Sequence, residues 1–187
     1  MEQTKQTIRT LDLVYIAVGA ALIAVCSWIS IPLTVPFTLQ TFAIFFLMVL
    51  LGGKRSTASV MVWLLLGAAG VPVFAQFTSG LGIVLGNTGG YMIGFLFIGM
   101  IYMTAEHFFG QKLPVQIISL LLGLAVCYAF GTAWFTVVYT RTNGAVGIGA
   151  VLSWCVLPFI LPDLGKLLLA LTLARRVAPA LQRVRAS

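Results

Sequence analysis

Charged side chains are scarce in this sequence. They make up 8% of its 187 residues, whereas about a quarter of the residues in an average soluble domain are charged. Hydrophobic residues make up 60%, and the mean hydropathy is +1.08. So few polar side chains cannot cover the surface of a globule of this size. The composition excludes an ordinary soluble domain and indicates a polytopic membrane protein whose helices are apolar on most sides.

Sequence motifs for phosphate binding and catalysis are missing as well. The chain has no phosphate-binding loop of the form G-x-x-x-x-G-K-[ST] and no G-x-G-x-x-G, H-E-x-x-H or G-x-S-x-G pattern. It holds only four acidic residues and one histidine. We therefore predict that the protein is not an enzyme and has no catalytic residues. Energy for uphill transport would have to come from a partner or an ion gradient.

Side chains that ligate metals are few and scattered. Cys26, Cys127 and Cys155 lie in separate apolar segments without the spacing of a metal site or a disulfide framework. We interpret them as small packing residues. His107 follows Glu106 at the end of a segment, which favours a solvated surface position. The sequence predicts no metal site and no cofactor.

Six apolar stretches are candidates for membrane-spanning helices, each of which needs about 20 residues. Helix is favoured because an open sheet would leave backbone groups unpaired in lipid, and the Leu, Ala, Val and Gly runs do not alternate as barrel strands do. We predict an all-α membrane protein that forms one integral membrane domain over residues 1–187. The predicted spans are roughly 12–30, 37–52, 56–75, 88–108, 115–139 and 148–174.

Basic residues predict the orientation of these spans, because Lys and Arg accumulate in cytoplasmic loops. With six spans, nine of the eleven basic residues fall on one side of the membrane: Lys5, Arg9, Lys54, Arg55, Lys112, Arg175, Arg176, Arg183 and Arg185. The opposite loops carry only Arg141, and Lys166 is intramembrane. Both termini are therefore predicted to be cytoplasmic. The net charge of +7 then reflects contact with the bilayer surface, not nucleic-acid binding.

The two loops on the outer side are unusually apolar. Residues 30–42 contain two prolines and no charge, and residues 70–91 are rich in glycine and aromatic side chains. A loop that is merely solvated would be more polar. We expect these loops to be half-buried, as lids or pocket walls. Re-entrant packing without a ligand is the alternative.

Asp163 and Lys166 lie inside the last apolar stretch. A charge at the centre of a bilayer costs about 2.5–3.5 kcal/mol on insertion scales, and the spacing i, i+3 places the two side chains on one helix face within contact range. Pro158 and Pro162 precede them, so we expect a break at 158–162 with Pro162 at the first helical position. The pair suits a ligand that offers N–H groups beside a carbonyl or carboxylate. A purely structural ion pair is the alternative.

Four motifs occur in a fixed order along the chain: VPFTLQ at 35–40, GVPVF at 70–74, LGNTGGYMIGF at 85–95 and PDLGK at 162–166. Together with the six-span pattern they resemble the BioY family, the biotin-specific substrate-capture subunits (S components) of energy-coupling factor (ECF) transporters. The resemblance covers essentially the whole chain. It implies the S-component fold, with six helices, both termini inside, and a biotin pocket near the outer face capped by the loop after the first helix.

The resemblance also implies ligand contacts at particular positions. Asp163 and Lys166 match the polar contacts of the family, and we expect Asp163 to accept a ureido N–H of biotin while Lys166 pairs with Asp163 and donates to the ligand. The further expected ligand-binding residues are polar Gln40, Thr78, Asn87 and Tyr91 and aromatic Phe37, Phe74, Phe77 and Trp154. Asn87 stands where the family usually has proline, and Thr78 where some members have asparagine. Biotin would be the transported ligand and not a cofactor.

S components are energised by a membrane scaffold subunit and ABC-type ATPase subunits, so the resemblance implies these partners and the bacterial cytoplasmic membrane as the location. Small residues mark the docking face on the first helix, and Ala17-x-x-x-Ala21 and Ala20-x-x-x-Ala24 fit it here. Ordinary packing would explain the same alanines.

Three other functions stay open. A self-sufficient secondary transporter would use Asp163 as a proton or cation site. An S component for another vitamin, such as thiamine or riboflavin, would share the architecture. In a structural membrane protein, the ion pair would only fix packing.

Overall fold

The structure, a computed structural model, describes residues 10–186, with side chains to residue 181. Lys5 and Arg9 lie outside the described residues, as do the side chains of Arg183 and Arg185. The helices are α1 (Thr10–Trp28), α2 (Gln40–Leu51), α3 (Gly53–Ala68), the 3-10 turn η1 (Ala75–Phe77), α4 (Leu81–Val84), α5 (Gly89–Phe109), α6 (Leu113–Asn143), α7 (Ile148–Cys155) and α8 (Leu157–Ala186). Strands β1 (Ser30–Ile31) and β2 (Phe37–Thr38) form a short antiparallel hairpin, which the all-helical prediction did not include.

Five of the predicted spans each overlap one helix, and the sixth, 148–174, covers α7 and part of α8. The helices differ in length. Among the described residues, four segments are long and apolar enough to cross a membrane: α1, α5, α6 and the α7–α8 run up to residue 181. The other two are shorter, since α2 has 12 residues and α3 has 16. At 1.5 Å per residue they are about 18 and 24 Å long, against a hydrocarbon core of about 30 Å. Six crossings therefore remain a prediction.

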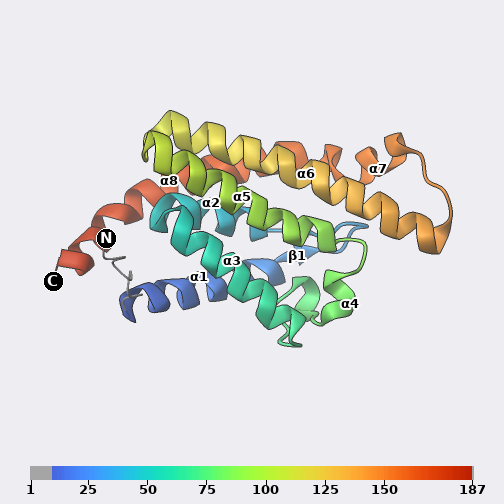
Figure 1. The fold of residues 1–187 in the computed structure, drawn as a ribbon, viewed down its shortest axis with the longest axis horizontal. Coiled ribbons are helices and arrows are strands. Elements are labelled where there is room, and N and C mark those ends of the chain that lie inside the picture. Colours follow the sequence, from blue (N-terminus) through green and yellow to red (C-terminus); the bar gives the residue numbers. More distant parts are fainter. Residues whose placement is uncertain (1–9, 187) are drawn as a thin grey trace, which may run out of the picture.

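The helices pack side by side along one long axis (Figure 1). The pair α5–α6 forms an extensive contact, α2 packs against α8, and α1 packs against α3. The start of α1 and the end of α8 lie at one end of the molecule, while the β1–β2 hairpin, α4 and α7 lie toward the other. Glycines let α5 and α6 approach closely: a Cβ on Gly131 would lie 2.2 Å from the Tyr91 ring, and one on Gly94 would lie 2.7 Å from Cys127 Sγ.

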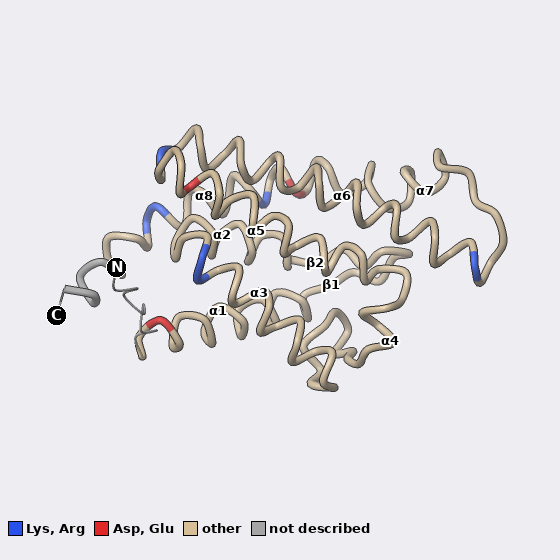
Figure 2. Tube along the Cα trace, in the orientation of Figure 1, with Lys and Arg blue, Asp and Glu red and all other residues tan. Residues whose placement is uncertain are grey.

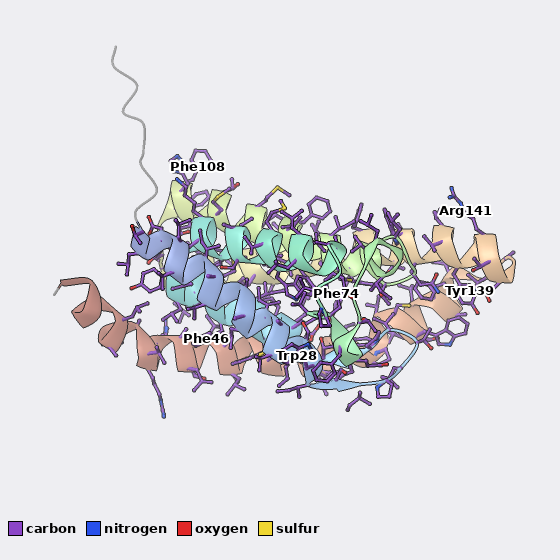
Figure 3. The ribbon with its side chains drawn as sticks, turned by 90° about the horizontal axis from the view of Figure 1, so that it is seen from below. Trp28, Phe46, Phe74, Phe108, Tyr139 and Arg141 are labelled. Atoms are coloured by element: carbon purple, nitrogen blue, oxygen red, sulfur yellow. The ribbon has the colours of Figure 1, made fainter. Side chains whose placement is uncertain are left out.

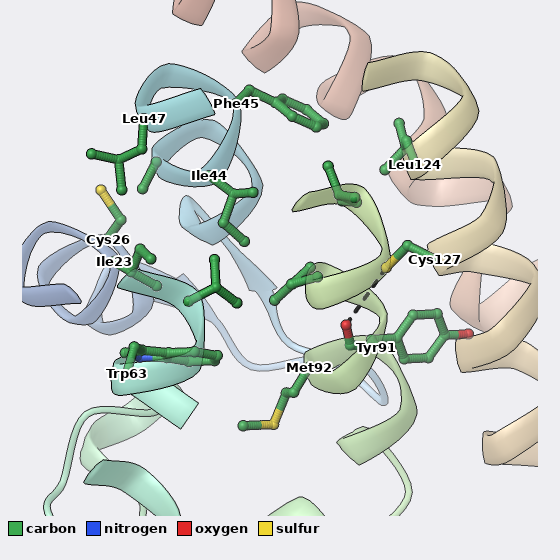
Figure 4. Packing of buried hydrophobic residues seen from close by; sticks show 14 of the residues in the cluster. Ile23, Cys26, Ile44, Phe45, Leu47, Trp63, Tyr91, Met92, Leu124 and Cys127 are labelled. Carbon is green, nitrogen blue, oxygen red and sulfur yellow. Dashed lines mark hydrogen bonds between the residues drawn. The ribbon is translucent and has the colours of Figure 1, made fainter. Parts of the chain in front are cut away.

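The buried core runs between these helices (Figure 4). Trp63 is fully buried, and its indole N–H donates to the Val73 carbonyl at 2.9 Å. Phe74 folds back onto Trp63 with ring centroids 5.1 Å apart. The segment after α3 is therefore packed into the protein, which agrees with the expectation that the second outer loop is half-buried.

The break in the last apolar stretch lies earlier than predicted. Helix α7 ends at Cys155, Val156 leaves the helical region (φ −126°, ψ −58°), and α8 begins at Leu157. Pro158 is then the second residue of α8, where a missing N–H is tolerated because the first-turn N–H groups have no helical partner. Pro162 lies inside α8, so the prediction that it occupies the first helical position is wrong.

Most of the described charged residues lie at one end of the molecule (Figure 2), whereas Asp163 and Lys166 lie within α8. Lys54 and Arg55 lie in the first turn of α3, and Arg55 pairs with Asp12 of α1 at 2.7 Å. The Glu106 carboxylate, at the end of α5, accepts the Gly53 N–H at 2.6 Å. This hydrogen bond joins the α2–α3 corner to the α5–α6 corner, so both corners lie at the same level. Arg141 lies at the opposite end, in the last turn of α6 (Figure 3).

Candidate ligand-binding site

A cavity of about 360 Å³ lies among the β1–β2 hairpin, η1, α5, α6 and α8. This volume falls in the range of about 300–1,000 Å³ that is typical of small-molecule sites. Its apolar wall includes Phe74, Met92, Phe95, Leu124 and Phe159. The lining residues that carry hydroxyl, amide or charged groups are Thr34, Thr38, Gln40, Thr41, Gln76, Thr78, Asn87, Thr88, Tyr91, Tyr128, Asp163 and Lys166.

Lys166 has its three N–H groups directed at oxygen atoms of the protein. Its Nζ donates to Asp163 Oδ1 at 2.8 Å, to the Thr38 carbonyl at 2.7 Å and to Thr41 Oγ1 at 3.1 Å. It also lies 4.1 Å from the centroid of the Phe37 ring. Lys166 is 7% exposed and Asp163 is 2% exposed, so the predicted contact forms as a buried ion pair.

Asp163 accepts further hydrogen bonds from two other helices. The Thr41 hydroxyl, in the first turn of α2, donates to Oδ1 at 2.8 Å, and the Tyr128 hydroxyl, on α6, donates to Oδ2 at 2.6 Å. A carboxylate has about four acceptor positions, so Oδ2 retains capacity for another donor. The floor of the cavity is thus a neutralised and oriented carboxylate that can accept an N–H from a ligand. Sequence reasoning missed Thr41 and Tyr128, although a hydroxyl within an apolar span was a usable signal for Tyr128.

The other predicted polar residues all line the cavity but differ in their bonding. Gln40 Nε2 donates to Ser27 Oγ at 2.7 Å, and its Oε1 accepts from Thr38 Oγ1 at 3.0 Å. Tyr91 shares a 3.0 Å hydrogen bond with Thr132 Oγ1.

Thr78 and Asn87 reach the cavity from the second outer loop. The Thr78 hydroxyl donates to the Ala75 carbonyl at 2.9 Å. The Asn87 amide has no hydrogen-bond partner among residues 10–181, which leaves it available to a ligand.

The predicted aromatic wall is only partly present. Phe74 lines the cavity, but Phe37, Phe77 and Trp154 are not among its lining residues. Phe37 packs between Lys166 and Phe159, Phe77 is 63% exposed, and Trp154 is 41% exposed with its ring 6.1 Å from that of Tyr139. Trp154 lies in the last turn of α7, beside buried Cys155, and does not reach the cavity.

The described residues contain no group of three or more His, Cys, Asp or Glu side chains that could hold a metal ion. Cys26, Cys127 and Cys155 are free and buried, in agreement with a packing role. His107 is exposed at the end of α5.

Comparisons with known proteins agree with this architecture. The BioY family profile matches residues 1–183. This chain belongs to the BioY family. It is 38% identical to the "Biotin transporter BioY" of Thermotoga maritima over 89% of this chain and 95% of that protein. It is 34% identical to the "Probable biotin transporter BioY" of Pyrococcus horikoshii over 87% and 93% of the two chains.

A solved structure resembles this BioY-family chain as well. The crystal structure of "the S-component for biotin from an ECF-type ABC transporter" superposes with a TM-score of 0.76 at 27% identity and covers 95% of this chain and 94% of that chain. The fold is therefore the S-component fold. Its neighbour and the named relatives are transport proteins, not enzymes.

The alanines predicted to dock a scaffold subunit divide into two faces of α1. Ala20 and Ala24 are 4% and 5% exposed and face the interior, where they are not available to a partner. Ala17 and Ala21 lie on the exposed face. Docking of this BioY-family protein through Ala17 and Ala21 remains a prediction.

Proposed function

We propose that this chain captures biotin with high affinity as the S component of an ECF-type transporter in the bacterial cytoplasmic membrane. The curated relatives are named as biotin transporters, and the similar solved structure is a biotin S component. The cavity among the membrane helices has a volume suited to one small ligand. Partner ATPases would supply the energy.

The observation that carries this proposal is the acceptor capacity of Asp163 Oδ2 at the cavity floor. Biotin has a ureido ring with two N–H donors, and a buried carboxylate is a strong acceptor for such donors. Lys166 neutralises and orients the carboxylate through its 2.8 Å contact. The thiophane ring and alkyl chain of biotin are apolar and would contact side chains such as Phe95 and Leu124. In this pose the ureido ring lies on the floor and the chain of biotin extends toward the outer loops.

The scaffold subunit would dock on the exposed face of α1, where Ala17 and Ala21 permit close helix approach. Six crossings with both termini in the cytoplasm fit this assembly. The described basic residues at the end where α1 begins support that orientation.

Titration of biotin into the purified protein in detergent tests the proposal. Wild type should bind one biotin tightly. Asp163→Asn should weaken binding about 10–100-fold, because a hydrogen bond to a charged group contributes about 1.5–3 kcal/mol. Asp12→Asn is the matched control, since Asp12 also pairs with a basic residue but does not line the cavity.

The alternative functions predict different results for the same purified protein and for cells that express it. If the folded wild-type protein does not bind biotin but binds thiamine or riboflavin, it is an S component for another vitamin. Uptake that persists without ATPase partners and stops on addition of an uncoupler would indicate a secondary transporter.

A further inference from the structure

Two consecutive residues in the second outer loop have left-handed backbone. Gln76 has φ 56° and Phe77 has φ 58°. Few residues other than glycine adopt positive φ, and for a bulky side chain such as Phe it is an outlier. Such conformations persist only where the surroundings fix them, and they cluster at ligand-binding and switch positions. The contacts around this turn therefore show which residues hold it in this conformation and which side chain it presents to the cavity.

Phe74 anchors the N-terminal side of the turn. Its side chain is 1% exposed, and its ring fills the space beside Gly67, where a Cβ would lie 2.0 Å from Phe74 Cζ. The Phe74 N–H donates to the Thr78 carbonyl at 3.1 Å, which closes the backbone around Ala75, Gln76 and Phe77.

Trp28, the last residue of α1, anchors the other side. Its ring stacks on Phe77 with centroids 4.9 Å apart and planes inclined by 23°. The Trp28 indole N–H donates to the Pro72 carbonyl at 2.9 Å, so the same residue holds the loop at two points. Figure 3 shows Trp28 and Phe74 in the region where α1 meets this loop. Gln76 is held between two anchored aromatic residues.

Gln76 lines the cavity, and its amide has no hydrogen-bond partner among the residues whose side chains are described. Its loop packs against α1, whereas Asp163 and Lys166 belong to α8, so the amide and the ion pair reach the cavity from different elements. By contrast, Gln40 and Thr78 already bond to other groups of the protein. Gln76 thus offers two N–H donors and one carbonyl acceptor to whatever occupies this side of the cavity.

We propose that Gln76 is a specificity-determining residue that binds the polar end of the ligand's chain. This inference rests on the proposed function, in which the ureido ring occupies the floor at Asp163 and the chain extends toward the outer loops. The group at the end of that chain is a carboxylate in biotin. An uncharged amide donates to a carboxylate and both donates to and accepts from a carboxamide. The substrate class is therefore biotin together with neutral derivatives such as biotinamide.

The test measures the affinities of biotin and biotinamide for wild type and variants by calorimetric titration. Wild type should bind the two ligands within about tenfold of each other, because the amide serves both end groups. Gln76→Glu should lower the affinity for biotin relative to biotinamide by about tenfold at low ionic strength, since two carboxylates then meet. Asn143→Asp adds the same charge at the far end of α6, outside the cavity, and should leave the ratio unchanged.

A second variant separates ligand contact from backbone shape. Glycine adopts positive φ without strain, so Gln76→Gly should keep the turn and unfold at or above the wild-type Tm while binding both ligands several-fold more weakly. A loop with a merely structural role would give unchanged affinity in this variant.

Each outcome bears on one of the two proposals. An unchanged ratio in Gln76→Glu, or unchanged affinity in Gln76→Gly, would overturn the assignment of Gln76 and leave biotin capture intact. Wild type that binds neither ligand would overturn the proposed function and this inference with it.

Discussion

Within the cavity floor, the two charged residues have different tasks. The Lys166 ammonium donates to Asp163, Thr38 and Thr41, and no N–H is left over for a ligand in this arrangement. Asp163 Oδ2 accepts one hydrogen bond, from the Tyr128 hydroxyl, and can accept another from a ligand. Lys166 therefore acts through Asp163, as a positioning residue, whereas the sequence led us to expect that it would also donate to biotin.

Removal of Lys166 alone tests this division. Lys166→Met leaves the carboxylate buried without a cation, which destabilises a protein by about 3–5 kcal/mol. The double variant Asp163→Asn, Lys166→Met removes both charges and should recover most of the stability, but it should not recover tight biotin binding. Thermal unfolding in detergent, followed by biotin titration, measures both quantities.

The other described ion pair provides the control for this experiment. The Asp12 and Arg55 side chains are 24% and 32% exposed, and pairs in contact with solvent contribute about 0–1 kcal/mol. Arg55→Met should therefore change stability much less than Lys166→Met. A Lys166→Met protein as stable as wild type would contradict a tightly coupled buried pair.

Residue spacing predicted the contact between Asp163 and Lys166, which lie within one helical turn. It did not predict the contacts of Asp163 with residues of other helices. Asp163 and Lys166 are three positions apart, so one helical turn brings them together. Thr41 lies 122 positions from Asp163, and Tyr128 lies 35 positions away. Those contacts depend on how α2 and α6 pack against α8, which spacing along the chain does not encode.

Among the helices and loops, the end of α3 decides the shape of the second outer loop. The predicted span 56–75 extends past the helix, which stops at Ala68 because Gly70 has φ 105° and Pro72 follows. The chain then reverses, and Phe74 packs beside Gly67. Hydrophobicity continues through Val73 and Phe74, so an apolar run alone overestimated the length of this helix.

A pair of glycine substitutions tests the Phe74 anchor. In Gly67→Ala the new Cβ would lie 2.0 Å from the Phe74 ring, and such overpacking costs about 1–3 kcal/mol. Biotin affinity should fall as well, since Phe74 and the turn beyond it line the cavity. Thermal unfolding and biotin titration follow the two effects.

Gly165→Ala is the matched helical control. A Cβ at this position in α8 meets nothing within 4 Å. Alanine is favoured over glycine inside a helix by about 0.5–1 kcal/mol, so this variant should be slightly more stable than wild type. If Gly67→Ala and Gly165→Ala changed the stability equally and in the same direction, the close packing of Phe74 against Gly67 would not stabilise the loop as inferred.

For the whole molecule, the prediction to test is that the two short helices, α2 and α3, cross the bilayer. Composition predicted the membrane class, and the basic residues predicted which ends lie together. The Gly53–Glu106 hydrogen bond places the α2–α3 corner beside the end of α5, which supports a full crossing by α2 and α3. The β1–β2 hairpin precedes α2 and lengthens that segment at the other end. Periodicity could not predict this division, because the stretch 37–52 is apolar in both its extended and its helical part.

Labelling from one side of the membrane tests the six-crossing topology. Asn143→Cys, at the end of α6, should react with a membrane-impermeant maleimide added to intact spheroplasts. Lys54→Cys, at the start of α3, should react only after the membrane is permeabilised. The native cysteines provide a low background, because Cys26, Cys127 and Cys155 are at most 6% exposed.

The pattern of labelling separates the possible topologies. The reverse accessibility of the two cysteines would place the termini outside and contradict the distribution of basic residues. If α2 and α3 instead formed a re-entrant hairpin that entered from the outer side, Lys54→Cys would lie within the bilayer and stay unlabelled in both conditions. The four long helices would then be the only crossings, and the termini would still share one side. Six crossings are therefore supported only if Lys54→Cys is labelled after permeabilisation and not before. Six crossings would also place the cavity on the outer side of the membrane.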